Sequence, residues 1–265
     1  MCRWVAYAGP DIYLEDLLFD QQNSLISQSL HARRSSQTTN GDGFGVAWYG
    51  RRAQPGLFKD ILPAWNDENL RSLAAQVQSR LFFAHVRAST GTSVARSNCH
   101  PFQFDNWAFM HNGKIGNWME CRREVEALIS PNLYRHRQGT TDSEALFMVA
   151  LSEGLQDDPV RAMERTCSRI TQIMRQHGAT EPLRMSAAVT DGNLIWAFRF
   201  SSDAASPTLY FGSPDTHTRD RAPVGQINTI ASEPSDEADH WHVVPEGHGL
   251  RWSGGRVSTF GFAPA

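Results

Sequence analysis

Two kinds of hydrophobic pattern follow one another along the chain. Short segments rich in β-branched, aromatic and aliphatic residues, each ending near a turn signal, predict strands. They cover 3–8, 45–49, 81–86, 107–111, 185–190, 194–200 and 226–231. Longer segments in which apolar residues recur every three or four positions predict helices. These cover 17–30, 66–78, 118–129, 142–153 and 160–177.

The order of these segments predicts an α+β sandwich. Runs of strands are separated by runs of helices, and Asp191-Gly192-Asn193 is a hairpin signal between two of the strands. Strands and helices do not alternate strictly, which disfavours a doubly wound parallel sheet. No internal repeat and no linker rich in proline, serine or glycine divides the chain, so we interpret residues 1–265 as a single domain.

Composition and charge narrow the possible partners. The 265 residues are 40% hydrophobic, enough for a substantial core, and carry a formal net charge of -3. There is no basic excess to neutralise phosphates or anionic lipids, so neither nucleic acid nor a membrane is an expected partner. The N-terminus has no signal-peptide pattern. The four cysteines form no C-x-x-C pair, and we interpret them as reduced thiols of a cytoplasmic protein.

The most distinctive chemistry belongs to Cys2, directly after the initiator methionine. Removal of Met1 would leave a thiol and a free α-amine on one residue. An unperturbed α-amine has a pKa of roughly 7.7 to 8.0 and a thiol one of about 8.5, so near neutral pH the amine can accept the thiol proton. Cys2 would then be a nucleophile with its own base. A lone cysteine at this position can also be incidental, so other motifs must support this interpretation.

Arg87 ends the apolar segment 81–86 and is followed by a Ser-Thr-Gly loop. A guanidinium at a strand end can make a bidentate contact with a carboxylate, such as that of an amino-acid ligand. The alternative for this segment alone is a solvated arginine.

Two further motifs could complete an acyl-transfer site. Asn112-Gly113 ends another apolar segment and is ordinarily a turn. The same geometry could direct the asparagine amide and the glycine N–H at one oxyanion. In the third motif, Thr141 can cap a helix and Asp142 lies in its first turn, where a carboxylate is favoured. Arg87 and Asp142 together would hold the two charged ends of a free α-amino acid.

Taken in order, these segments resemble the class II glutamine amidotransferases, which use an N-terminal nucleophile. The matching segments are Met1-Cys2-Arg3, Asn40-Gly41-Asp42-Gly43-Phe44-Gly45-Val46, His85-Val86-Arg87-Ala88-Ser89-Thr90, His111-Asn112-Gly113 and Thr141-Asp142-Ser143-Glu144. The chain is most similar to the stand-alone branch that contains amidohydrolases of ergothioneine biosynthesis and glutathione degradation. Ala231-Ser232-Glu233-Pro234 and Trp241 are similar to that branch too.

The resemblance implies a role for each matching residue. Cys2 is the expected nucleophile, and Asn112 and Gly113 are the expected oxyanion hole. Arg87 is expected to hold the substrate α-carboxylate, and Asp142 the α-ammonium. The family fold is a four-layer αββα sandwich of the N-terminal-nucleophile hydrolase type. No cofactor is implied.

Thr90 and His111 are further substrate-binding candidates by the same resemblance. The synthase-linked family members have a tryptophan directly after the arginine and a histidine after the threonine. Here those positions are Ala88 and Gly91, so the pocket wall must differ.

The glycine-rich loop at 40–45 lacks a phosphate-loop pattern, and the resemblance places it beside the active site, with its glycines near Cys2. The histidines lack i, i+4 spacing, so no metal site is expected.

The expected reaction is hydrolysis of a γ-amide of glutamine or of a γ-glutamyl compound through a thioester on Cys2. The chain carries no synthetase or sugar-isomerase domain, which leaves either a γ-glutamyl hydrolase or a glutaminase that serves a separate synthase subunit. Two alternatives remain open. One is a catalytically silent regulatory or binding protein on the same fold. The other is an N-terminal-cysteine acylase of the penicillin or bile-salt type, which does not need the Arg87 and Asp142 pair.

Overall fold

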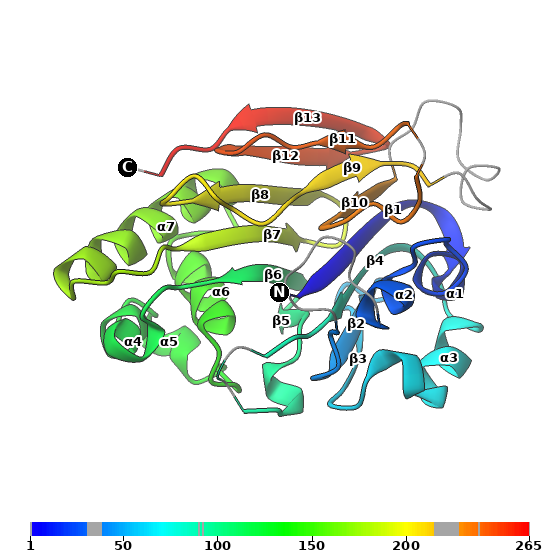
Figure 1. The fold of residues 1–265 in the computed structure, drawn as a ribbon, viewed down its shortest axis with the longest axis horizontal. Helices are drawn as coiled ribbons and strands as arrows, with labels where there is room; N and C mark the ends of the chain where they lie inside the picture. Colours follow the sequence, from blue (N-terminus) through cyan, green and yellow to red (C-terminus); the bar gives the residue numbers. More distant parts are fainter. Residues whose placement is uncertain are drawn as a thin grey trace.

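Two antiparallel sheets form the centre of the molecule (Figure 1). The computed structural model describes residues 2–30, 39–89, 91, 93–214, 228–237 and 239–264. Within those residues, the first sheet has the order β11 (His242–Val243), β9 (Tyr210–Gly212), β10 (Thr229–Ala231), β1 (Arg3–Tyr13), β4 (Gln78–Val86), β2 (Phe44–Trp48) and β3 (Gly56–Asp60). The second has the order β13 (Arg256–Gly261), β12 (His248–Ser253), β8 (Ile195–Ser201), β7 (Arg184–Thr190), β6 (Trp107–Lys114) and β5 (Phe102–Phe104).

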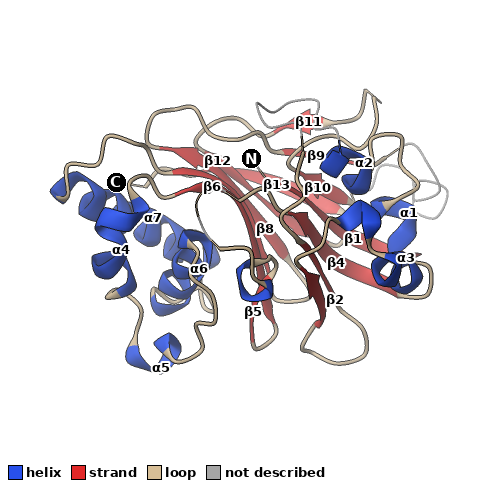
Figure 2. Cartoon of the chain, turned by 60° about the horizontal axis from the view of Figure 1, so that its bottom comes forward, coloured by secondary structure: helices blue, strands red, loops and turns tan. Residues whose placement is uncertain are grey.

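Helices cover the outer face of each sheet, on opposite sides of the strands (Figure 2). The first sheet is covered by α1 (Leu14–Leu18), α2 (Leu25–Leu30) and α3 (Glu68–Ala74). The helices on the side of the second sheet are α4 (Trp118–Glu126), α5 (Pro131–Tyr134), α6 (Asp142–Ser152) and α7 (Pro159–Gln176). Two short 3-10 turns, η1 (Ala64–Asn66) and η2 (Arg96–Asn98), lie in loops.

Three hydrophobic cores separate the four layers. On β1, Trp4 and Ala6 belong to the core between the two sheets, whereas Val5 and Tyr7 pack under α1 and α2. On β6, Met110 faces the same central core. Because side chains alternate between the faces of a strand, the sequence of each central strand serves two cores at once. The predicted four-layer αββα sandwich is confirmed.

Most predicted elements are present, but several boundaries were wrong, among them the strand at 3–8, which continues to Tyr13. The segment 17–30 forms two helices because Asn23 leaves the helical path, donating its backbone N–H to the Ser235 carbonyl and its side-chain amide to the Pro234 carbonyl. The helix at 66–78 ends at Ala74, since β4 begins at Gln78. The strand at 107–111 continues to Lys114. The hairpin at Asp191 is confirmed, and 226–227 lie outside the described residues.

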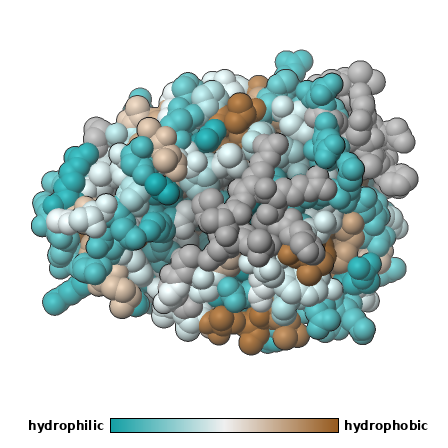
Figure 3. All heavy atoms as spheres, in the orientation of Figure 1, coloured by the Kyte–Doolittle hydropathy of each residue, from teal (hydrophilic) through white to brown (hydrophobic). Residues whose placement is uncertain are grey.

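On the face drawn in Figure 3, hydrophilic residues predominate and hydrophobic ones form small separate groups. None of the helices in the described ranges is long and apolar enough to cross a bilayer.

A buried ion pair fastens the start of β1. The Arg3 Nε atom lies 2.8 Å from Glu233 Oε2, and both side chains are almost completely buried. Arg3 also donates through Nη1 to the carbonyl of Cys2, at 3.0 Å. The ion pair therefore joins the backbone at Cys2, the candidate nucleophile, to Glu233 in the segment that follows β10.

We expect Glu233→Gln to lower the free energy of unfolding by about 3–5 kcal/mol, because it leaves the Arg3 guanidinium buried without a counter-charge. Urea unfolding measures the change. Arg161→Ala is the control, since the Arg161–Asp158 pair is largely exposed and should contribute less than about 1 kcal/mol. Equal losses in the two variants would contradict this account of Arg3.

Candidate active site

The pairing of β1 with β4 brings Cys2 to Ala88. Arg3 lies opposite Val86 in this antiparallel pair, so the residues just beyond the two strand ends are neighbours. The Ala88 N–H donates to the Cys2 Sγ at 3.4 Å, and the Sγ lies 3.6 Å from the Ala88 carbonyl oxygen. The peptide of Ala88 thus holds the thiol in place at the beginning of β1.

The environment of the Cys2 thiol favours its protonated form. Burial raises the pKa of the Cys2 thiol above its ordinary value, although the Ala88 N–H and the Arg87 guanidinium act in the opposite direction. Because the thiolate is the reactive form, a nearby base must accept this proton before sulfur attacks a carbonyl.

Arg87 directly follows β4 and is buried. Its guanidinium donates to the carbonyl oxygens of Asp42 and Ser93 and to the Ser89 Oγ, each at 3.3 Å. The Asp42 carboxylate in turn accepts from the Ser89 N–H at 2.7 Å. Two loops that are distant in sequence therefore orient one cation toward the cavity that Cys2 lines.

The glycine-rich loop at 40–45 does lie beside this site, but its glycines serve a different contact from the predicted one. A Cβ at Gly43 would lie 2.7 Å from the Cys99 Sγ, and a Cβ at Gly45 would lie 2.1 Å from the His100 carbonyl oxygen. The loop thus packs against the 99–100 segment, and close approach to Cys2 was the wrong reason for these glycines.

Asn112 and Gly113 lie within β6, opposite Ser186 and Met185 of β7. The tight turn expected at this dipeptide was therefore wrong. Asn112 is two residues from the inward-facing Met110 and shares its side of the strand. A Cβ at Gly113 would lie 1.9 Å from the Arg184 carbonyl oxygen, so only glycine fits here.

Asp142 is the first residue of α6, and the predicted cap is present. The Thr141 Oγ1 accepts from the Glu144 N–H at 3.2 Å. The Asp142 carboxylate accepts from the N–H of Ile115 at 2.8 Å and from that of Ser143 at 2.8 Å. These bonds tie α6 to the chain just after β6, so Asp142 is held close to Asn112 and Gly113.

The ring of His111 is used by the protein itself. Its Nε2 lies 3.2 Å from the Arg184 carbonyl oxygen, an acceptor, so Nε2 carries the proton and Nδ1 accepts from the Ser143 hydroxyl at 2.8 Å. Burial lowers the pKa of the His111 imidazole, although the nearby Asp142 carboxylate acts to raise it. His111 thus joins β6, β7 and α6 as a neutral ring.

One cavity of about 250 Å³ collects these side chains. It is lined by Cys2, Arg87, Ala88, His100, His111, Asn112, Gly113, Lys114, Thr141, Asp142, Ser143, Arg184 and Pro207. Six of the seven candidate residues line it, and the seventh, Thr90, lies outside the described residues. The sequence analysis missed His100, Ser143 and Arg184; Ser143 stands next to a predicted residue, whereas no local pattern marks the other two.

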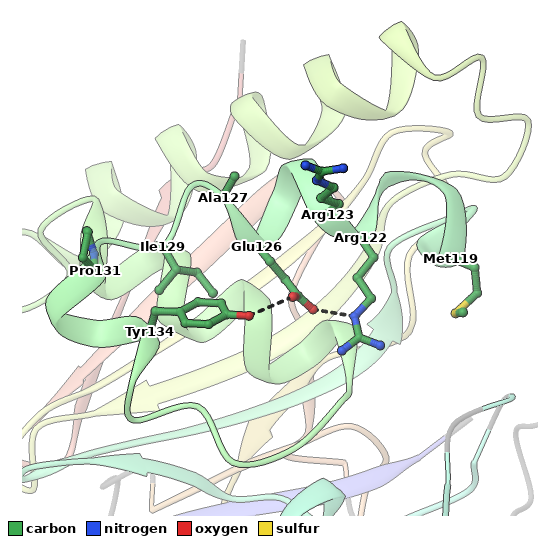
Figure 4. A pocket seen from close by; sticks show the side chains of 8 residues that line it. All are labelled: Met119, Arg122, Arg123, Glu126, Ala127, Ile129, Pro131 and Tyr134. Carbon is green, nitrogen blue, oxygen red and sulfur yellow. Dashed lines mark hydrogen bonds and ion pairs between the residues drawn. The ribbon is translucent and has the colours of Figure 1, made fainter.

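A wider hollow of about 720 Å³ lies elsewhere, over α4 and α5 (Figure 4). Its one carboxylate, Glu126, is bonded to Arg122 at 2.5 Å and to the Tyr134 hydroxyl at 3.5 Å. No cysteine, serine or threonine is among its lining residues, whereas the candidate nucleophile lines the Cys2 cavity. Across the described ranges, no three or more histidine, cysteine or acidic residues are grouped as metal ligands.

Comparison with known proteins identifies the family. The family model of the glutamine amidotransferases class II matches residues 19–208. The chain belongs to this family. A probable glutamine amidotransferase of Saccharomyces cerevisiae, DUG3, is 34% identical over 92% of this chain and 80% of its own length. The γ-glutamyl-hercynylcysteine sulfoxide hydrolase of Mycolicibacterium smegmatis is 26% identical over 94% of each chain.

A solved structure agrees with this class II glutamine amidotransferase over its whole length. The glutamine aminotransferase class-II domain protein from Silicibacter pomeroyi is 37% identical, with a TM-score of 0.77 over 99% of this chain and 100% of that one. The match includes both sheets and both helical layers. We therefore class the protein as an amidohydrolase.

One lysine of this amidotransferase lies over an aromatic ring. Lys59 lies opposite Gly45 on β3, and its Nζ is 5.2 Å from the centre of the Phe102 ring. Burial lowers the pKa of Lys59 from 10.5 to about 8. The folded protein thus holds this proton less tightly than the unfolded chain does.

This shift predicts a pH-dependent gain in Lys59→Met. Between pH 8 and 10.5 the unfolded chain binds more protons at residue 59, so this lysine destabilises the fold at neutral pH and ceases to do so at high pH. We expect the variant to be more stable at pH 7 by on the order of 1–3 kcal/mol, with the gain shrinking toward pH 10. Urea unfolding at both pH values tests this, with Lys114→Met as the control. Parallel pH profiles of wild type and Lys59→Met would contradict it.

Proposed function

We propose that this class II glutamine amidotransferase hydrolyses the γ-amide of glutamine or of a γ-glutamyl compound, with Cys2 as its nucleophile. The observation that carries the proposal is the cavity itself. The Cys2 thiol, the Arg87 guanidinium, the Asn112 amide and the Asp142 carboxylate reach one space of about 250 Å³ from four different elements or their ends. An acyl-transfer site for an α-amino acid needs these four kinds of group.

The substrate is held by its α-amino-acid end. Arg87 binds the α-carboxylate, because its planar guanidinium matches a carboxylate in a bidentate contact. Asp142 binds the α-ammonium; its carboxylate already accepts two backbone N–H groups and adds the charge that pairs with a cation. With both ends fixed, the γ-carbonyl is directed toward Cys2.

Acylation follows when the Cys2 thiol loses its proton. We assign the base to the α-amine of Cys2, freed by removal of Met1, and this assignment fits the protonated thiol that burial favours. The sulfur then attacks the γ-carbonyl carbon, and Asn112 and Gly113 stabilise the oxyanion. The amine leaves with the proton, and a γ-glutamyl thioester remains on Cys2.

The other candidate residues have supporting roles in this proposal. His111 orients Ser143 and the end of β6 through its two ring nitrogens, and forms part of the cavity wall. Thr90 stays a predicted pocket residue. All four cysteines are free, which is consistent with a cytoplasmic setting.

The name of one relative bears on the leaving amine. The hollow of about 550 Å³ that shares Lys114 and Asp142 with the Cys2 cavity adjoins the α-ammonium end of the substrate and not its γ-amide. The mycobacterial relative is named for a γ-glutamyl substrate. This favours a γ-glutamyl hydrolase over a glutaminase that feeds a separate synthase subunit.

The decisive experiment is intact-mass measurement before and after treatment with 6-diazo-5-oxo-L-norleucine, a glutamine-shaped electrophile. We expect the untreated enzyme to lack Met1 and the treated enzyme to carry one adduct, located on Cys2. Cys2→Ala should take up no adduct and show no turnover, whereas Cys99→Ala should still be labelled at Cys2. A protein that retains Met1 and stays unlabelled would support the silent regulatory alternative.

Asn112→Ala and Arg87→Lys should separate the two halves of the site. Loss of the Asn112 amide should lower kcat by roughly 100-fold or more with little change in KM, because the oxyanion forms only in the transition state. Arg87→Lys should mainly raise KM, since a point charge cannot replace the guanidinium fork. Steady-state kinetics on glutamine or γ-glutamyl-p-nitroanilide gives both constants. An unchanged kcat in Asn112→Ala would remove its oxyanion role, and hydrolysis of N-acyl amides without a glutamyl group would favour the acylase alternative.

A further inference from the structure

His100 is a buried polar residue of the Cys2 cavity that the proposed reaction has not used. It lies just before β5, and its ring stacks on that of His85, with the ring centres 4.2 Å apart. The edge of Phe102 closes another side, at 4.5 Å between ring centres. Only 4% of His100 is exposed, and the residue lines the cavity together with Cys2 and Asn112.

Both ring nitrogens of His100 are buried, and neither has a hydrogen-bond partner among the described residues. His111 by contrast uses both of its nitrogens, and His85 uses one, its Nε2 lying 3.4 Å from the His111 carbonyl oxygen while its Nδ1 has no partner among the described residues. A buried polar group without a partner costs about 1–3 kcal/mol. A partner from the cavity would offset this cost.

The backbone around His100 is shaped to keep its ring there. A Cβ at Gly45 would lie 2.1 Å from the His100 carbonyl oxygen, so a larger residue at 45 would push this segment out of place. His85 faces the space between the sheets from β4, next to Gly45 of β2. The His100 backbone therefore occupies a position on the inner face of the first sheet that a side chain at 45 would otherwise fill.

The chemistry of His100 is that of a neutral imidazole. Burial lowers the pKa of His100 well below its ordinary value, with the neighbouring His85 and His111 acting in the same direction. A neutral ring has one N–H donor and one nitrogen acceptor. Its unprotonated nitrogen can therefore accept a hydrogen bond from a neutral ligand, and the ring offers no charge to the substrate carboxylate.

Most polar groups of a bound γ-glutamyl substrate already have partners in the proposed function. The carboxylate has Arg87, the ammonium has Asp142, and the carbonyl oxygen has Asn112 and Gly113. What remains is the water that must attack the thioester after the amine has left. Water is small, neutral, and both a donor and an acceptor. We propose that His100 binds the water that hydrolyses the Cys2 thioester, an inference that rests on the proposed function.

In this step the water oxygen bonds to the thioester carbonyl carbon, and the carbon–sulfur bond breaks. One proton of the water passes to the α-amine of residue 2 and returns to the sulfur as the thiol re-forms. His100 accepts a hydrogen bond from the other water O–H and remains neutral throughout. It therefore orients the water and does not exchange a proton with it.

The test compares His100→Phe with His136→Phe. Phenylalanine keeps a ring against His85 and removes both nitrogens, whereas His136 is an exposed histidine whose ring meets the edge of Phe104 away from the cavity. Three rates are measured in each: labelling by 6-diazo-5-oxo-L-norleucine, hydrolysis of whichever of glutamine or γ-glutamyl-p-nitroanilide the wild type turns over, and formation of γ-glutamyl hydroxamate with added hydroxylamine.

We expect His100→Phe to be labelled at nearly the wild-type rate but to hydrolyse the substrate roughly tenfold more slowly or worse. The γ-glutamyl thioester should then accumulate in the intact mass. Hydroxylamine, a stronger nucleophile, should still be acylated, so the ratio of hydroxamate to glutamate should rise. His136→Phe should behave as wild type, and His100→Gln, which keeps one donor and one acceptor, should recover part of the hydrolysis.

Wild-type hydrolysis in His100→Phe would overturn the inference, as would equal losses of labelling and hydrolysis with an unchanged product ratio. If the phenylalanine variant does not fold, the product ratio in His100→Gln and His100→Asn decides in the same way, and a wild-type ratio in both overturns the inference. A wild-type enzyme that is neither labelled nor active refutes the proposed function instead.

Discussion

The whole site depends on one strand pairing. Antiparallel pairing of β1 with β4 sets Arg3 opposite Val86, and this register puts the beginning of one strand beside the end of the other. Cys2 and Arg87 are 85 positions apart in the chain. Cys2 directly precedes β1 and Arg87 directly follows β4, so the pairing of the two strands brings these residues to the same end of the sheet. A shift of one residue would turn every side chain of β1 to the opposite face. Trp4 and Ala6 would then leave the central core. The packing of this core therefore fixes the strand register on which the site depends.

The second sheet completes the site through the same alternation. Met110 is buried in the central core, and Asn112, two residues further along β6, is brought to the inner side by that anchor. The indole N–H of Trp4 donates to the Ser186 carbonyl at 3.2 Å, which connects β1 to β7 across the space between the sheets. The polar site lies at one end of the apolar core between the two sheets. At that end, both sheets contribute backbone groups as well as side chains to the cavity.

The sequence predicted the α+β class and the cap of α6 from local patterns, and it predicted six residues of the cavity through motifs and the family resemblance that they carry. It missed the hairpin of β12 and β13, whose outer strand is mostly exposed and has no apolar run, although Gly254-Gly255 forms its turn with positive φ at both residues. It misjudged Asn112-Gly113, since pairing with β7 overrides a local turn preference. His100 and Arg184 reach the cavity only through tertiary packing, which no spacing along the chain reveals.

The hydrogen bonds of Arg87 have a thermodynamic consequence. Among the described residues, its guanidinium donates to the carbonyl oxygens of Asp42 and Ser93 and to the Ser89 hydroxyl. An incoming carboxylate must share or replace some of these bonds. In the proposed function, carboxylate binding and the order of Ser89 and Ser93 are therefore linked, and by reciprocity whatever stiffens these two residues changes carboxylate affinity by the same factor as the carboxylate changes their order. The side chain proposed to bind the substrate thus also holds together the residues that surround it.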